Sequence, residues 1–216
     1  MPVARKGSYQ ASKVFLLLFV HKKKTFLSLM IEPSTQARVT VTFLTMPRAP
    51  VAPPAPLPAN ARFVRVDPIS VTFYRYLYRE VGGEYLWWMR RAESDARLAS
   101  ILENPLVSVF VLTLGEEPVG IAELDNRQLI TVNIGYFGLM KHTIGRGLGV
   151  PFLQATLEQA WSRRPRAVTV NTCTADHPRA MPAYLKAGFE KIRSVDEVWD
   201  IPDRLGLHVP DHLRLR

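Results

Sequence analysis

The sequence predicts a mixed α/β (α+β) domain with a central, mostly antiparallel sheet flanked by helices. Between residues 61 and 200, some short segments alternate apolar and polar residues, and others carry apolar residues at helical spacing. The two kinds of segment follow one another in the order β-α-α-β-β-β-α-β-α-β. A composition of 47% hydrophobic and 22% charged residues is that of a globular protein.

The first half of this order begins with a strand over 61–66. A helix over 70–82 follows, with Ser70 as its N-cap and Gly82 as its stop signal. The loop GGEYLWWMRRAE leads to a second short helix that begins near Ser94. The segments VSVFVLTL and VGIAELD, joined by the turn GEEP, predict a β-hairpin, and LITVNIGYFGLM predicts a third long strand.

The second half alternates helices with strands. A helix predicted to begin near Gly147 has Val150, Leu153, Leu157 and Trp161 on one face. It is followed by a buried strand, AVTVNT, and a helix, PRAMPAYLKAG. The segment FEKIRSVDEVWDI predicts a final strand or hairpin.

The positive charge is concentrated at the start of the chain. Of a net charge of +9, residues 1–60 account for +7, with eight Lys and Arg against the single acid Glu32. We therefore expect residues 1–47 to be a basic segment outside the domain, either disordered or an over-extended gene start with Met46 as the true start. Six prolines over 47–58 predict an extended linker at 48–60. The predicted domain then covers 61–200, and 201–216 form a C-terminal tail.

Several other classes of protein are disfavoured. The apolar run at 14–20 is shorter than the roughly 20 residues that cross a bilayer, and HKKK follows it where a signal peptide has small residues. The single Cys173 excludes an intramolecular disulfide and makes a Cys-based zinc site implausible. We expect a cytoplasmic protein with no metal and no membrane contact. Because residues 61–216 are nearly neutral, DNA binding is at most an accessory role of the basic segment.

The stretch HTIGRGLGVPFL has glycines at 145, 147 and 149, where a strand ends and a helix is about to begin. A helix N-terminus offers unpaired N–H groups and partial positive charge, and glycines let an anion approach the backbone. The stretch lacks the Gly-Lys-Ser/Thr ending of a Walker loop and the acid of a dinucleotide-binding fingerprint. It predicts an anion site of another kind, or a turn without a ligand.

Together with HPRAMPAYLKAGFEK, one strand later, this turn resembles the GNAT family of acetyl-CoA-dependent N-acetyltransferases. The family's loop reads Gln/Arg-x-x-Gly-x-Gly/Ala, and its later helix reads Asn-x-x-Ala-x-x-x-Tyr-x-x-x-Gly-Phe. The matching residues are Gly147, Gly149, Ala180, Tyr184, Gly188 and Phe189. Ile144 replaces the loop's Gln or Arg, and His177 replaces the helix's Asn. The segments YLWW, GYFGLM and IGRGLG are similar to those of a bacterial, uncharacterised subgroup of the family.

The resemblance spans about 61–199 and implies a sheet splayed between its fourth and fifth predicted strands, where the acyl thioester enters. It implies transfer of acetyl from acetyl-CoA to a primary amine of a small molecule or peptide, by a monomer or homodimer, without a metal because the thioester is already activated. A degenerate module that senses acyl-CoA without turnover is the alternative. The implied CoA-binding residues are Leu139, Met140, Ile144, Gly145, Arg146, Gly147, Leu148, Gly149 and Val150.

The resemblance also implies catalytic candidates. Tyr184 matches the family's helix tyrosine and is expected to donate a proton or hydrogen bond to the leaving thiolate; the alternative is a core tyrosine. The family's strand Glu corresponds to Asn133, whose amide is no base. Glu123, on the neighbouring strand, acts through a water if it faces the cleft, or is a solvent-facing strand residue. The implied acceptor pocket comprises Glu84, Tyr85, Trp87, Trp88 and Tyr136. The alternatives are that the tryptophans cover the core and that Glu84 is a solvated acid.

Overall fold

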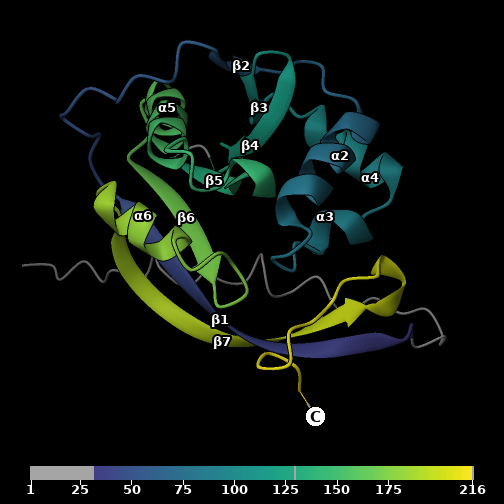
Figure 1. Cartoon of the computed structure of the whole chain (residues 1–216). Coiled ribbons are helices and arrows are strands. Elements are labelled where there is room, and N and C mark those ends of the chain that lie inside the picture. Colours follow the sequence, from purple (N-terminus) through teal and green to yellow (C-terminus); the bar gives the residue numbers. More distant parts are fainter. Residues whose placement is uncertain (1–31, 129, 216) are drawn as a thin grey trace, which may run out of the picture. The chain divides into compact units, whose positions relative to one another are not determined.

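The computed structural model describes residues 32–128 and 130–215, and it has the mixed α/β architecture that the sequence predicts (Figure 1). One seven-stranded sheet has the strand order β2-β3-β4-β5-β6-β1-β7. All neighbouring strands are antiparallel except β5 and β6, which are parallel. The strands are β1 (Ser34–Met46), β2 (Ala61–Arg65), β3 (Val107–Leu114), β4 (Glu117–Asp125), β5 (Thr131–Leu139), β6 (Ala167–Cys173) and β7 (Glu190–Pro202).

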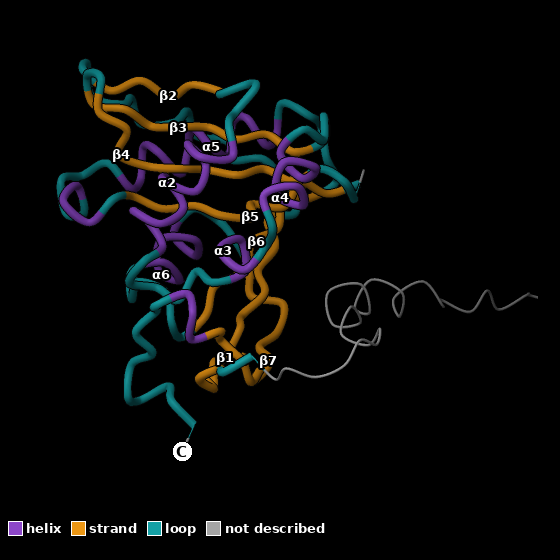
Figure 2. The backbone as a smooth tube through the Cα atoms, turned by 90° about the vertical axis from the view of Figure 1, so that its right-hand side faces the viewer, coloured by secondary structure: helices purple, strands orange, loops and turns teal. Residues whose placement is uncertain are grey.

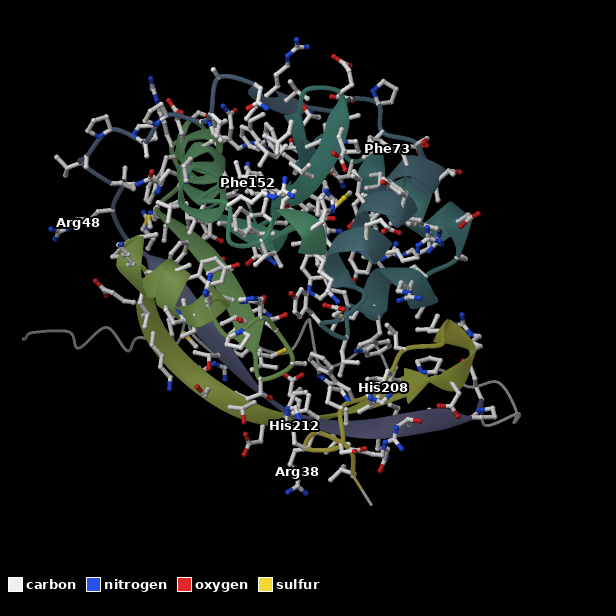
Figure 3. All side chains as sticks on the ribbon, viewed as in Figure 1. Arg38, Arg48, Phe73, Phe152, His208 and His212 are labelled. Carbon is white, nitrogen blue, oxygen red and sulfur yellow. The ribbon has the colours of Figure 1, made fainter. Side chains whose placement is uncertain are left out.

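Helices pack on both faces of the sheet (Figures 1 and 2). They are α2 (Val71–Gly82), α3 (Met89–Ala92), α4 (Asp95–Leu102), α5 (Gly149–Trp161) and α6 (Ala180–Lys186), with two short 3-10 helices, η1 (Lys141–Thr143) and η2 (Asp203–Leu205). On one face, α5 and α6 share a core with β5 and β6, and Phe152 points from α5 into it (Figure 3). On the other face, α2 and α4 cover β3 and β4.

Serine caps start two of the helices. The Oγ of Ser70 accepts a hydrogen bond from the amide of Phe73 at 3.2 Å, and α2 begins at the residue after Ser70. The Oγ of Ser94 accepts from the amide of Arg97 at 3.2 Å, and α4 begins likewise. Each side chain satisfies one of the amides that a helix start leaves unpaired. The predicted beginnings of both helices are therefore confirmed.

Three details differ from the sequence prediction. The predicted loop after α2 contains the short helix α3. The helix expected near Gly147 begins at Gly149, and its Val150 is 48% exposed although it was placed on the buried face. Phe152 is buried instead, together with Leu153 and Leu157 of the predicted face.

The largest correction concerns the chain before the linker. Residues 34–46 are not a segment outside the domain: they form β1, which lies between β6 and β7 and pairs with both. Alternate side chains along β1, including Ala37, Val39 and Val41, are buried. A start at Met46 would remove all but the last residue of this strand. The remainder of the predicted basic segment, including the apolar run at 14–20, lies outside the described residues.

The proline-rich linker and the C-terminal tail are both attached to the domain. The linker runs from β1, near one edge of the sheet, to β2 at the opposite edge, and the amide of Ala55 donates to Gln154 of α5 at 2.8 Å. In the tail, Leu213 is buried and accepts a hydrogen bond from the amide of Arg38 in β1 at 2.7 Å. Residues 201–216 therefore do not form a separate tail, since their first two residues complete β7 and later ones cover β1.

Candidate functional site

The strands β5 and β6 diverge, as the sequence predicts. They are the fourth and fifth predicted strands, and their numbers are one higher because β1 precedes them in the chain. Their parallel pairing extends only over Thr131–Ile134 and Ala167–Val170, although both strands continue (Figure 1). A β-bulge at Gly135 shifts the register between β4 and β5 at the same point, since Glu123 pairs with Tyr136 and Leu124 pairs with Ile134. A bulge bends its strand, so the backbone of β5 beyond Ile134 turns away from β6.

The bulge also changes which face each β5 side chain occupies. Val132 and Ile134 belong to the core under α5, as does Phe137, although two residues separate Ile134 from Phe137. Tyr136 therefore points to the opposite face and packs with α2. A Cβ at Gly135 would lie 3.2 Å from the Glu123 carboxylate, so glycine leaves room for that side chain.

The glycine turn follows β5 and opens onto free space. Gly145 and Gly147 have φ values of +88° and +79°, which favour glycine, and an added Cβ on either would meet no atom within 4 Å. The buried Thr143 precedes the turn, and its hydroxyl donates a hydrogen bond to the carbonyl of Met140 at 2.8 Å. The first amides of α5, which begins at Gly149, point out of this turn as at any helix start.

The other predicted CoA-binding residues frame this turn. Leu139 closes β5 and packs on the core beside the first residue of α5. Leu148 is buried and anchors the start of α5, whereas Arg146 and Val150 are exposed. Ile144 is half-buried and offers no charge where the family has Gln or Arg, so Arg146 is the cation that the turn itself presents.

Tyr184 lies at the C-terminal end of α6, on the side of the sheet that carries the glycine turn. Its side chain is buried against Phe189, with ring centroids 5.7 Å apart, and Gly188 has the φ of +103° that folds Phe189 back onto it. Burial raises the pKa of Tyr184, and the negative charge of Asp176 raises this pKa further. The phenol therefore keeps its proton at neutral pH and acts as a hydrogen-bond donor.

Asp176, which the sequence motifs did not single out, brings several of the candidates together. It lies three residues after the end of β6, and its carboxylate accepts hydrogen bonds from the amide of Cys173 at 2.8 Å, the hydroxyl of Thr172 at 2.9 Å and the indole of Trp87 at 3.4 Å. Its charge also raises the pKa values of Tyr184 and Tyr85. The one available signal was its place immediately before His177, where the family's helix motif begins.

Glu123 has neither of the two environments expected for it. It is buried, with 1% of its side chain exposed, so it does not face solvent. It accepts hydrogen bonds from Arg90 Nη2 at 2.6 Å and from the Tyr74 hydroxyl at 2.5 Å. Burial and the nearby carboxylate raise the pKa of Tyr74, and the attraction of Glu123 raises that of Arg90 despite burial. Because this carboxylate is fully buried and paired with the charged guanidinium of Arg90, it is part of the fold rather than a free base.

Asn133 lies in the part of β5 that still pairs with β6, before the two strands diverge. Its side-chain oxygen accepts a hydrogen bond from Thr169 across the paired part of β5 and β6 at 3.1 Å. The amide thus joins the two strands where they still form a ladder.

The two tryptophans among the predicted acceptor residues lie in different parts of the structure. Trp87 packs with Tyr136 and Tyr78, with ring centroids 5.2 Å apart in both cases, and it fills the space above Gly82, where a Cβ would lie 2.4 Å from its ring. Trp88 faces the other way, into the core of β1 and β7, with its ring 6.5 Å from that of Trp199. The two tryptophans therefore do not form one wall.

Glu84 and Tyr85 precede the two tryptophans in the loop between α2 and α3. Glu84 is exposed and pairs with Lys141 of η1 at 2.5 Å, so its charge is already matched. Tyr85 is half-buried, with its ring 5.9 Å from that of His177. Among the described residues, no group of three His, Cys, Asp or Glu side chains is arranged to hold a metal ion, and none of the helices there is long and apolar enough to cross a membrane.

Known solved structures share this fold. No protein-family model and no curated protein matches the chain. A GCN5-related N-acetyltransferase from Sphaerobacter thermophilus superposes with a TM-score of 0.56 at 19% identity, over 79% of this chain and 53% of that one. Another from Kribbella flavida gives 0.52 at 15%, over 77% and 60%. A putative acetyltransferase of the GNAT family from Novosphingobium aromaticivorans gives 0.51 at 12%, over 79% and 69%.

These similarities show the fold of the GCN5-related N-acetyltransferases. The chain spans between about half and two-thirds of the length of the proteins it resembles. The fold expected from the glycine turn and the α6 helix is therefore confirmed.

Proposed function

We propose that the chain is an acetyl-CoA-dependent N-acetyltransferase that acts on a primary amine of a small molecule or peptide. The observation that carries this proposal is the juxtaposition of two features at the end of β5. An open glycine turn leads into α5, and immediately before it β5 separates from β6. One feature suits the phosphates of CoA and the other suits its extended arm and thioester.

The phosphates would be held by the turn. The backbone around Gly145 and Gly147 has no side chain in the way, and the N-terminus of α5 contributes unpaired amides and a partial positive charge. Arg146, exposed on the same turn, supplies the cation that Ile144 lacks. The pantetheine arm would pair with the edge of β5 beyond Ile134, which β6 leaves open.

The transfer needs a proton acceptor and a donor. A primary amine with a pKa of about 10.4 is mostly protonated at pH 7. We assign the acceptor-side role to Asp176, which attracts the ammonium and receives its proton directly or through water. The amine nitrogen then attacks the acetyl carbonyl carbon, and the carbon–sulfur bond breaks. The second proton that the nitrogen loses as the amide forms passes to the departing thiolate, which the Tyr184 hydroxyl stabilises with a hydrogen bond.

A CoA-binding module without turnover is the second candidate. The observation that favours it is Asn133, which stands where the family has a glutamate and is engaged with Thr169 in the strand ladder. Because Glu123 is tied to Arg90 and Tyr74, it does not replace that glutamate. The two candidates share acetyl-CoA binding and differ only in turnover.

The deciding experiment measures thiol release from acetyl-CoA over a panel of primary amines, with the full chain and its Asp176→Asn variant. Turnover with at least one amine supports the acetyltransferase, and a loss in the variant of roughly a hundredfold, with acetyl-CoA affinity retained, supports the role of Asp176. Tight acetyl-CoA binding with no acetylated product across the panel identifies the non-catalytic module instead. Absence of acetyl-CoA binding rejects both.

A further inference from the structure

A second polar site lies apart from the glycine turn, in a groove between α2, α3 and η2. The groove has a volume of about 580 Å³, which is within the range of small-molecule sites. Within this groove, α3 contacts the segment after β7. The contact is a hydrogen bond of 2.9 Å from Arg91 Nη2 to the carbonyl of Leu205. Figure 1 shows the yellow segment after β7 close to α3.

The lining of this groove is strongly basic. It contains five arginines and a single acid; the charged residues are Arg75, Arg79, Arg90, Arg91, Arg204 and Asp95. Because residues 61–216 as a whole are nearly neutral, this concentration of guanidinium groups is local. A concave surface lined by one sign of charge focuses the field and attracts ions of the opposite sign.

Two of these arginines are already committed to the fold. Arg75 pairs with Asp95 at 2.7 Å and also donates to the carbonyls of Arg90 and Glu93, which ties α2 to the segment before α4. Arg90 pairs with the buried Glu123. Their charges are therefore matched by carboxylates within the protein.

The charges of Arg79 and Arg91 are less fully matched. Arg91 makes its hydrogen bond to a neutral carbonyl, which leaves its positive charge in place. Arg79 pairs only with its neighbour Glu80 on the surface, where both side chains are well exposed and the interaction is weak. Arg204 lies at the rim of the groove and also interacts with other residues of the protein. The groove therefore holds a surplus of positive charge.

Hydroxyl donors complete the set. Thr72 and Tyr76 of α2 line the same groove, one turn apart on the helix face that carries Arg79. Arg90 also lines it, and its Nε is a buried donor without a hydrogen-bond partner among the described residues. Guanidinium forks and hydroxyls are the donors that bind carboxylate and phosphate oxygens.

We infer that this groove binds a small molecule carrying at least one phosphate or carboxylate group. Arg79 and Arg91 hold the anion, with Arg204 at the rim. The volume exceeds what an isolated anion needs, so the ligand has a body that lies against Tyr76 and Leu205. This site is separate from the predicted phosphate site at the glycine turn, because it is formed by α2, α3 and η2 and shares no residue with that turn.

The test compares three variants with the full-length wild type by calorimetry at about 0.15 M ionic strength. The groove variant is Arg79→Gln with Arg91→Gln. The matched control, Arg62→Gln with Arg97→Gln, removes the same charge from two exposed arginines outside the groove. The third variant, Arg146→Gln, weakens the glycine turn. The probes are inorganic pyrophosphate and citrate, which represent phosphate and carboxylate ligands.

We expect the groove variant to lose affinity for at least one probe by roughly tenfold or more, the scale of a lost charged hydrogen bond. The control should bind as the wild type does, and Arg146→Gln should retain the groove's share of binding. The probe that loses more affinity identifies the ligand's anionic group. Absence of binding to the wild type, unchanged binding in the groove variant, or an equal loss in the control overturns the inference.

Discussion

The guanidinium of Arg90 on α3 and the carboxylate of Glu123 on β4 pair in the protein interior, with Nη2 2.6 Å from Oε1. The pair joins the helical segment after α2 to the centre of the sheet, and the ring of Tyr136 lies 5.4 Å from the same guanidinium. Removing one partner of such a pair leaves the other charge buried without compensation. The pair is therefore a structural requirement of the segment that carries Trp87.

The first prediction follows from this pair. Glu123→Gln should destabilise the protein by about 3–5 kcal/mol, because Arg90 keeps its charge in a buried place. Turnover per folded molecule should stay near that of the wild type, since we propose Asp176 rather than Glu123 as the proton acceptor. Chemical denaturation and turnover on one preparation measure both. The control Glu80→Gln removes an exposed pair and should cost less than about 1 kcal/mol. A stable Glu123→Gln protein without turnover would return Glu123 to the active site.

The second prediction concerns β1. A chain that starts at Met46 should fail to fold, because it lacks the strand that pairs with both β6 and β7 and leaves β7 without a neighbour in the sheet. A chain that starts at Glu32 keeps the whole strand and is the matched control. Circular dichroism and thermal melting compare the two. A cooperative melt of the shorter chain near the wild-type temperature would show that β1 is dispensable.

The contrast between β1 and the rest of the sheet shows what the sequence could predict. From residue 61 onward, local signals were sufficient: Ser70 capped its helix, and the glycine turn fell between a strand and α5. In STQARVTVTFLTM the same alternation of apolar residues was present, but the basic charge of the surrounding segment outweighed it. Pairing between residues about 130 positions apart, such as Val41 with Cys173, leaves no local signal.

The sequence likewise predicted some parts of the candidate site and missed others. A glycine turn and the motif around Tyr184 are local and could be read directly. The surroundings of Glu123 depend on Arg90 and Tyr74, which come from two other elements, so its burial could not be inferred from its own strand. Asp176 was missed for the same reason, because its link to Trp87 spans 89 positions.

The third prediction tests the glycine turn. Gly147→Val places a branched side chain in the open space over the turn, at a φ of +79°, and should weaken acetyl-CoA binding by roughly tenfold or more through loss of phosphate contacts. Gly115→Val is the matched control, because Gly115 has a φ of +58° and equally open surroundings in the turn between β3 and β4. Both variants should lose similar stability, about 1–3 kcal/mol. Equal acetyl-CoA affinities in the two variants would reject the phosphate assignment.

The fourth prediction concerns alkaline pH. Burial raises the pKa values of Tyr74, Tyr78, Tyr136 and Tyr184, and it raises that of Cys173 to about 12. In the unfolded chain these tyrosines ionise near pH 10 and the thiol near 8.5. The stability that they contribute is therefore complete below about pH 8.5 and falls as the pH rises through 10 toward the folded-state values.

Tyrosinate absorbance and circular dichroism, recorded together during a pH titration, test this expectation. The four buried tyrosines should ionise only in step with unfolding. Their ionisation near pH 10 in a protein that keeps its native spectrum would contradict the burial that the structure gives them.

The last prediction separates the two interpretations of Tyr184. Tyr184→Phe removes one oxygen and keeps the packing against Phe189 and Phe137. If the hydroxyl donates to the departing thiolate, the interaction strengthens as charge develops on sulfur and belongs mainly to the transition state. Turnover should then fall by roughly tenfold to a thousandfold while acetyl-CoA affinity and melting temperature stay near the wild-type values.

Tyr74→Phe provides the control for this variant. The Tyr74 hydroxyl donates to Glu123 in the interior, so its loss should lower stability by about 1–3 kcal/mol and leave turnover per folded molecule nearly unchanged. The core interpretation predicts that Tyr184→Phe behaves in the same way as Tyr74→Phe. Because the raised pKa of Tyr184 keeps the phenol protonated, the loss of turnover in Tyr184→Phe should also be constant between about pH 7 and 9, below the ordinary tyrosine pKa. A Tyr184→Phe protein with full turnover would remove this residue from the mechanism.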